Sequence, residues 1–377
     1  MSIQKYLKKN GFNENKSDIN EILLNCVRNN QYDKLKLVLN YVKKNDIILD
    51  FTKQNKNKIY PHICSIENNN NKITKLLFEY SNKSYIKFNI NEKDRKGDTS
   101  LTSSTYHNNI EIVRLIIDYA NDHNITLDIN STDIEKVYAL IWCTYNNNFE
   151  MTKLLINYAN NHNILLNINE QDKGRQYPLL WSIMNNNIKL VNLLIDYANS
   201  NNIILKLKAS DEYGIFPIFS CAYKNNLEMA RILIDYANKN NIILNVNDKC
   251  NDNDYPLLQC TFSYNNNYSM AKLLIDYANK NNIILDINGR YKDSYPLLES
   301  VYNNNVEMVN LIINYAIEKN IIIEFKEQDL LKVIKDRISN NNNNNNNNNK
   351  NKNNNNNNNK FIKKYIYMYV NNTYKLD

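Results

Sequence analysis

The 377-residue sequence is poor in the residues that build most enzyme sites. It has five glycines, five prolines, four histidines and two tryptophans. With so few glycines it contains no glycine-rich loop of the kind that wraps phosphate groups, and its histidines form no HExxH zinc motif. We therefore expect no enzymatic activity, no cofactor, no metal site and no small-molecule substrate.

Long apolar runs and paired cysteines are also absent. No stretch approaches the run of about 18 apolar residues that indicates a membrane span. The N-terminal residues lack the apolar core of a signal peptide. None of the six cysteines stands in CxxC spacing, which is typical of buried thiols in a reducing compartment. These absences predict an intracellular, cytoplasmic protein with no membrane partner.

The net charge does not indicate a class of binding partner. The formal net charge of +7 is small for 377 residues and neither predicts nor excludes weak contact with nucleic acid, which we do not expect to be the partner. Asn and Lys are in excess throughout, as an AT-rich genome alone would produce. We therefore interpret no single Asn or Lys as a functional signal.

A helical phrase that reads LLIDYAN in its clearest copies recurs along the chain. Its tyrosine stands at Tyr41, Tyr80, Tyr119, Tyr158, Tyr197, Tyr236, Tyr277 and Tyr315, at intervals of 39, 39, 39, 39, 39, 41 and 38 residues. A fixed period of 20 to 50 residues is typical of solenoids, in which each unit buries its apolar face against its neighbours. The sequence therefore predicts an all-α repeat array.

Each unit follows the same order of elements. A turn containing aspartate or glycine precedes a position that holds all five prolines of the chain, Pro61, Pro178, Pro217, Pro256 and Pro296. Ser100 and Ala139 occupy this proline column in two other units. Proline is favoured in the first turn of a helix, so a short helix is expected there. An Asn cluster forms the next loop, because Asn tolerates the left-handed conformation. A longer helix and an apolar phrase such as IILDIN complete the unit.

Small residues occupy the position four residues after the proline column. They are Ser65, Ser104, Cys143, Ser182, Cys221, Cys260 and Ser300, and Cys26 fits the same place in the first unit. A helix packed tightly between neighbours has room only for a small side chain there. This column predicts close packing of the short helices and explains four cysteines as small buried side chains.

This order of elements resembles the ankyrin repeat. Asp94, Gly97, Thr99, Leu101 and the run EIVRLII at 111–117 match the family pattern in order. The resemblance implies an ankyrin-type solenoid with a helix-turn-helix and a hairpin loop in each unit. The period of about 39 is longer than the family's 33, and YANKNN or YANSNN replaces the glycine that ends the second helix. We expect the extra residues to lengthen that helix and the hairpin arm.

The pattern divides the chain into three segments. Residues 1–19 read as a polar N-terminal tail, and residues 20–325 as eight ankyrin-like repeats. Residues 326–377 read as a degenerate ninth repeat, interrupted at 340–360 by a disordered poly-Asn insert. We interpret that insert as an expanded solvated loop, and self-association through it stays open.

Candidate binding residues lie on one side of the short helix. Trp142 and Trp181 stand three residues after the proline column, and the aromatic residues six after it include Tyr106, Tyr145 and Tyr223. The resemblance places this side in the concave groove where partners bind. Basic residues at the turns, among them Arg95, Lys96 and Arg175, would border the groove. Packing between units is the favoured role for the tyrosines, whereas for the tryptophans packing and binding stay equally open.

Together these features predict a non-enzymatic scaffold that binds a protein partner through the groove and the hairpin tips. Aromatic residues of this kind are enriched at the energetic centres of interfaces. Two alternatives remain: a weak nucleic-acid binder that uses the basic rim and aromatic rings, and a structural protein that self-assembles through its Asn-rich tail. Partner, pathway and oligomeric state are not encoded in recognisable motifs.

Overall fold

A computed structural model describes residues 1–16, 18–49, 60–83, 87–262 and 267–324. Over these residues the chain is all-α, with 17 helices and no strand. It forms two compact units, Met1–Leu205 and Lys206–Asp377. No helix in the described ranges is long and apolar enough to cross a bilayer. The expected ninth repeat and its poly-Asn insert lie outside the described residues.

Sixteen of the helices form eight consecutive pairs. The first helices are α2 (Ile19–Arg28), α4 (Pro61–Glu67), α6 (Ser100–Tyr106), α8 (Ala139–Tyr145), α10 (Pro178–Met184), α12 (Pro217–Tyr223), α14 (Pro256–Gln259) and α16 (Pro296–Tyr302). The second helices are α3 (Tyr32–Lys44), α5 (Asn71–Lys83), α7 (Ile110–Asp122), α9 (Phe149–Asn161), α11 (Ile188–Ser200), α13 (Leu227–Lys239), α15 (Tyr268–Lys280) and α17 (Val306–Glu318). Every second helix has 13 residues.

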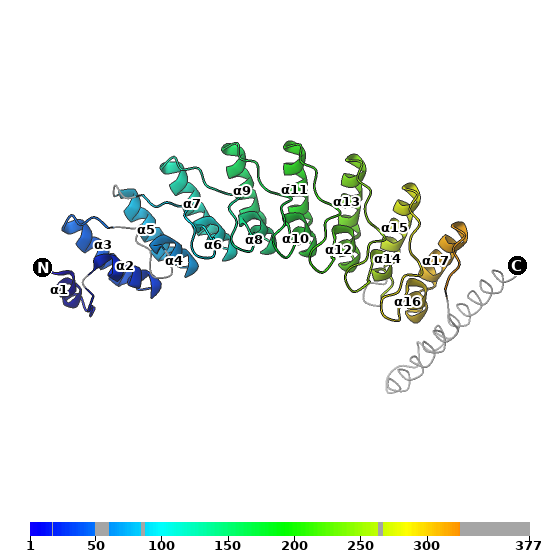
Figure 1. Cartoon of the computed structure of the whole chain (residues 1–377), viewed down its shortest axis with the longest axis horizontal. Helices are drawn as coiled ribbons and strands as arrows, with labels where there is room; N and C mark the ends of the chain where they lie inside the picture. Colours follow the sequence, from blue (N-terminus) through cyan, green and yellow to red (C-terminus); the bar gives the residue numbers. More distant parts are fainter. Residues whose placement is uncertain (17, 50–59, 84–86, 263–266, 325–377) are drawn as a thin grey trace, which may run out of the picture. The chain divides into compact units, whose positions relative to one another are not determined.

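Within each unit the pairs stack in two layers (Figure 1). In the N-terminal unit, first helices α2, α4, α6, α8 and α10 contact one another in sequence, and so do second helices α3, α5, α7, α9 and α11. In the C-terminal unit, α12 packs on α14, while α13, α15 and α17 form the second layer. Apolar residues at three- and four-residue spacing bury one stripe of each second helix between the layers. The fold is therefore the predicted ankyrin-type solenoid.

The starts of the short helices follow the proline column. Helices α4, α10, α12, α14 and α16 each begin at their proline, and α6 and α8 begin at Ser100 and Ala139. Thr99 caps α6 with a capping box, in which its side chain accepts from the Thr102 N–H and the Thr102 hydroxyl accepts from the Thr99 N–H. The small column is confirmed as well, since all eight of its members are fully buried.

The Asn loops between the two helices of each pair are built from asparagines with separate tasks. Asn108 and Asn147 adopt the left-handed conformation, with φ of 55° and 56°. The following Asn148 caps α9, because its Oδ1 accepts from the Met151 N–H at 2.9 Å. Its side-chain amide donates to Asn108 Oδ1 of the preceding repeat at 2.6 Å. Asparagines therefore end the first helix, cap the second helix and link neighbouring repeats.

Breaking this link should weaken the stack. Asn148→Ala removes an N-cap and an inter-repeat hydrogen bond, so we expect the N-terminal unit to lose about 1–2 kcal/mol. Thermal unfolding followed by circular dichroism measures the loss. Asn157→Ala is the matched control, because Asn157 lies exposed in the middle of the same helix and its replacement should change stability by at most about 0.5 kcal/mol. Equal effects of the two substitutions would show that the Asn148 contacts contribute nothing.

The recurring tyrosine ties the second helix to the arm before it in the repeats of Tyr119, Tyr158, Tyr197, Tyr277 and Tyr315. In the repeat that ends with Tyr158, its hydroxyl accepts from the Leu127 N–H at 2.9 Å, and Tyr197 accepts from the Leu166 N–H at 2.8 Å. In the C-terminal unit Tyr277 accepts from the Leu244 N–H at 2.8 Å. The arm backbone needs such partners because its buried N–H groups have no helix or sheet to bond with. This hydrogen bond explains why tyrosine recurs at this position of the repeat.

Side-chain amides also join the arms. Asn91 donates to the Thr126 carbonyl at 2.8 Å and accepts from the Asp128 N–H at 3.0 Å. Asn130 repeats both bonds one unit later, with the Leu165 carbonyl and the Asn167 N–H. An asparagine side chain therefore pairs with the next arm much as a backbone strand would.

The hairpin turns are organised by aspartates, as expected. Asp94 Oδ1 accepts from the Lys96 and Asp98 N–H groups at 2.8 and 2.9 Å. Asp133, Asp172 and Asp211 make equivalent bonds. In the D-K-G turn that contains Gly174, the left-handed residue is Arg175, at φ 59°. The glycine lies one place before the position that Gly97 and Gly214 occupy.

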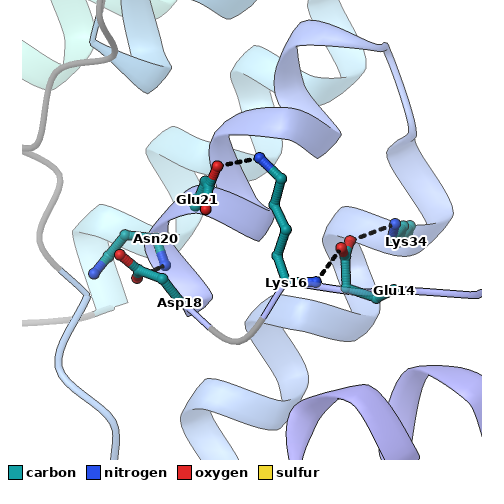
Figure 2. Close-up of polar contacts among 6 residues, drawn as sticks. All are labelled: Glu14, Lys16, Asp18, Asn20, Glu21 and Lys34. Atoms are coloured by element: carbon teal, nitrogen blue, oxygen red, sulfur yellow. Dashed lines mark hydrogen bonds and ion pairs between the residues drawn. The ribbon is translucent and has the colours of Figure 1, made fainter.

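The N-terminal end differs from the other repeats. Helix α1 (Ile3–Lys9), capped by Ser2, lies inside the segment expected to be a polar tail and packs on α3. Figure 2 shows how the following residues are held: Lys34 Nζ on α3 lies 2.9 Å from Glu14 Oε2, while Lys16 pairs with Glu21. The Asp18 side chain caps α2 by accepting from the Asn20 N–H at 3.0 Å.

Candidate functional site

Four of the predicted aromatic residues form a continuous row in the N-terminal unit. The ring centroids of Tyr106 and Trp142 are 4.8 Å apart, those of Trp142 and Tyr145 5.5 Å, and those of Tyr145 and Trp181 4.7 Å. Each contact is edge to face, with interplanar angles of 74°, 86° and 90°. This is the favoured geometry for aromatic pairs. We call these four residues the aromatic row.

The row lies on the accessible side of the first helices. Tyr106 ends α6, Trp142 and Tyr145 belong to α8, and Trp181 belongs to α10. Tyr106 and Tyr145 are 54% and 47% exposed, and the two tryptophans are half-buried. The small column one residue after each tryptophan is fully buried. The rings thus pack on one another across three repeats and still present faces to solvent.

Tyr223 has neighbours within its own unit. It lies in the C-terminal unit at the end of α12, where it is 50% exposed. Its ring stacks on Phe219 at 6.4 Å, and the Lys224 ammonium lies 5.7 Å from its centroid. The structure therefore joins four of the five predicted aromatic residues and leaves Tyr223 with neighbours of its own.

The predicted basic residues lie on the hairpin turns. Arg95, Lys96 and Arg175 are all exposed. Successive turns are joined through backbone bonds, from the Ile134 N–H to the Lys96 carbonyl at 2.8 Å and from the Lys173 N–H to the Glu135 carbonyl at 2.9 Å. These bonds fix the spacing of the turns beside the first helices.

Carboxylates near the row were missed by the sequence analysis. Burial and the neighbouring Asp94 raise the pKa of Asp98 to about 6. Burial, Asp94 and Asp98 raise the pKa of Glu67, while Lys96 lowers both values. A signal was available, because Glu67 stands six residues after Pro61, in the same column as Tyr106 and Tyr145.

The cysteines of the chain are mostly buried. Five of the six cysteines are buried free thiols, and Cys250 is half-buried. Burial raises the pKa of Cys26 and of Cys64 to about 11, so these thiols stay protonated and weakly nucleophilic at neutral pH. Over the part of the chain that the structure describes, no three His, Cys, Asp or Glu residues are arranged to hold a metal ion.

Comparison with known proteins gives a family match and a similar solved structure. The model of the family "Ankyrin repeats (3 copies)" matches residues 23–127 and 124–203. Among solved structures, the ankyrin repeat domain of Bcl-3, described as a unique member of the IkappaB protein family, is similar at 19% identity with a TM-score of 0.44. That match covers 63% of this chain and 92% of the Bcl-3 domain chain. No curated protein sequence matches the chain.

The family match falls on the repeats whose geometry is described above. It spans the pairs from α2 to α11, and the same turn, proline, Asn and tyrosine positions recur in α12 to α17. Ankyrin repeats generally mediate protein–protein interaction and are typically non-enzymatic. The family match and the repeat geometry together support an ankyrin repeat protein.

Proposed function

We propose that this chain is a non-enzymatic scaffold that binds a protein partner through the aromatic row, with the adjoining hairpin turns as the rim of the interface. The observation that supports this most is the row itself. Four large rings contact one another across three repeats, yet Tyr106 and Tyr145 keep about half of their surface exposed. Contiguous exposed aromatic surface is typical of interaction sites.

The energetics favour such a role. Tryptophan and tyrosine dominate the residues that contribute most to binding free energy. Edge-to-face contacts already restrict the rings of Tyr106, Trp142, Tyr145 and Trp181, so little side-chain entropy is lost when a partner covers them. The repeats beneath them are linked by asparagine and tyrosine hydrogen bonds, which holds the face in one shape before binding.

The turns would supply the polar rim. Arg95, Lys96 and Arg175 are exposed on turns that flank the first helices. Rim charges of this kind change association rates and salt dependence more than final affinity. A protein partner in the cytoplasm is consistent with the free thiols, and nucleic acid is tested as the alternative occupant.

The test is site-specific photocrosslinking in native lysate. A benzoylphenylalanine at Tyr145 should crosslink one protein, and the same group at exposed Asn157 on α9 should not.

Trp142→Ala/Trp181→Ala should weaken capture by at least about 30-fold, because truncating each anchor costs on the order of 1–2 kcal/mol. Circular dichroism checks that the variants stay folded. Identical capture by the wild type and the folded double variant would contradict the proposal. Crosslinks lost on nuclease treatment and steeply weakened by salt would favour nucleic acid.

A further inference from the structure

The aromatic row continues into a carboxylate at its N-terminal end. Glu67 ends α4, in the column that Tyr106 and Tyr145 occupy on α6 and α8. Helix α4 packs on α6, and α6 on α8. Three neighbouring repeats therefore carry Glu67, Tyr106 and Tyr145 at equivalent places on one face. An elongated segment lying along this face meets both chemistries.

Carboxylates gather at this end of the row, on and beside the turn that also carries the exposed Arg95 and Lys96. Two further carboxylates, Asp94 and Asp98, lie close enough to Glu67 to raise its pKa, and Asp133 adds to the effect on Asp98. Lys96 opposes the carboxylates at both places. Glu67 and Asp98 are half-buried, where charges are weakly screened by water. A carboxylate in such surroundings is therefore stabilised when a cation binds beside it.

We infer that the row binds a cationic segment of its partner, with an arginine or lysine side chain at Glu67 and Asp98 and apolar side chains on the rings of Tyr106, Trp142, Tyr145 and Trp181. This inference rests on the proposed function and names the chemistry of the partner. Charge complementarity selects the occupant: the carboxylates attract a basic segment and repel the phosphate backbone of a nucleic acid. The ring faces add cation–π attraction for a guanidinium group.

Two synthetic octapeptides test the inference. One alternates leucine and arginine, and the other carries glutamate in place of arginine; both are acetylated, amidated and labelled with a fluorophore. Fluorescence anisotropy with the full chain gives their affinities. The only two tryptophans of the chain both lie in the row, so quenching of protein fluorescence reports binding at the row itself.

We expect the arginine peptide to bind at least about 10-fold more tightly than the glutamate peptide, and Glu67→Gln/Asp98→Asn to weaken it by about 10-fold. Glu150→Gln is the matched control, since Glu150 is exposed on α9 and its loss should leave the affinity unchanged. Trp142→Ala/Trp181→Ala should weaken the arginine peptide as well.

The outcomes separate this inference from the proposed function. If both peptides bind equally and both are weakened by Trp142→Ala/Trp181→Ala, the row is a binding site and the cationic partner is wrong. Absence of arginine-peptide binding, or binding unaffected by Glu67→Gln/Asp98→Asn, also overturns the inference. Arginine-peptide binding that survives loss of both tryptophans contradicts the row as the site.

Discussion

Replacing His62 with leucine should raise the free energy of unfolding of the N-terminal unit, and the gain should grow as the pH falls. His62 follows Pro61 in α4 and is 1% exposed. Its ring stacks on Phe88, with centroids 4.8 Å apart. Neither ring nitrogen has a hydrogen-bond partner among the described residues. An unsatisfied buried polar group costs about 1–3 kcal/mol, so leucine should already stabilise the unit at neutral pH.

The repeat pattern shows that leucine fits this place. The residue one after the proline column is leucine or isoleucine in the other units, namely Leu101, Leu140, Leu179, Ile218, Leu257 and Leu297. All six are buried. The substitution therefore introduces a side chain that the same helix position accommodates elsewhere in the chain.

The pH dependence follows from the buried ring. Desolvation lowers the pKa of His62 from 6.5 to about 3. Between these values the unfolded chain binds a proton that the folded chain excludes, so acidification destabilises the wild type. The full shift corresponds to roughly 4–5 kcal/mol. The advantage of His62→Leu should thus be smallest above pH 6.5 and increase as the pH falls toward 3.

Other groups titrate in the same range with the opposite sign. Burial and Asp94 raise the pKa of Asp98 to about 6. Protonation of this carboxyl on acidification therefore raises the free energy of unfolding. The informative quantity is therefore the difference between variant and wild type at each pH. Urea unfolding followed by fluorescence measures it, since Trp142 and Trp181 both report on the unit that contains His62.

His162→Asn is the matched control. His162 follows α9 and is half-buried, and other repeats carry Asn201, Asn240 and Asn281 at the equivalent place. This control also removes one histidine, from a half-buried position instead of a fully buried one. A gain from His62→Leu that stays constant between pH 7 and pH 4 would mean that the ring of His62 titrates normally in the folded chain.

The sequence predicted those features of the fold that depend on one residue type at one repeat position. Prolines predicted the starts of the short helices, and small residues predicted their close contacts, because each position admits few alternatives. Asp94 and its equivalents predicted the turns for the same reason. The aromatic row was predicted as candidate residues, but the contacts between rings needed the stacking of three repeats.

The features that were missed depend on pairs of residues about one repeat apart. The amide of Asn148 reaches Asn108, and the hydroxyl of Tyr158 reaches the Leu127 backbone. In a chain so rich in Asn, composition hid the regular placement of these residues. Glu67 was overlooked because its column is otherwise aromatic in the neighbouring repeats, although its position in the column and the packing of α4 on α6 both place it on the same face.

Glu14→Gln should destabilise the N-terminal end of the stack. It leaves the Lys34 ammonium, whose side chain is 9% exposed, without the carboxylate that lies 2.9 Å away. Breaking a buried ion pair from one side costs about 3 kcal/mol. Although burial raises the pKa of Glu14, hydrogen bonds from the Lys16 N–H and from Lys34 hold it below its ordinary value. Glu14 is therefore charged at neutral pH.

The loss should be local, because in a repeat array each unit is stabilised mainly by its neighbours. Hydrogen exchange should accelerate in α1, α2 and α3 and stay unchanged in α8 to α11. The exposed pair Lys16–Glu21 provides the control (Figure 2): Glu21→Gln should cost at most about 1 kcal/mol. Glu14→Leu/Lys34→Met should recover much of the stability, since an apolar pair leaves no buried charge unpaired. If Glu14→Gln and Glu21→Gln accelerate exchange equally, the Glu14–Lys34 pair does not hold the end of the stack.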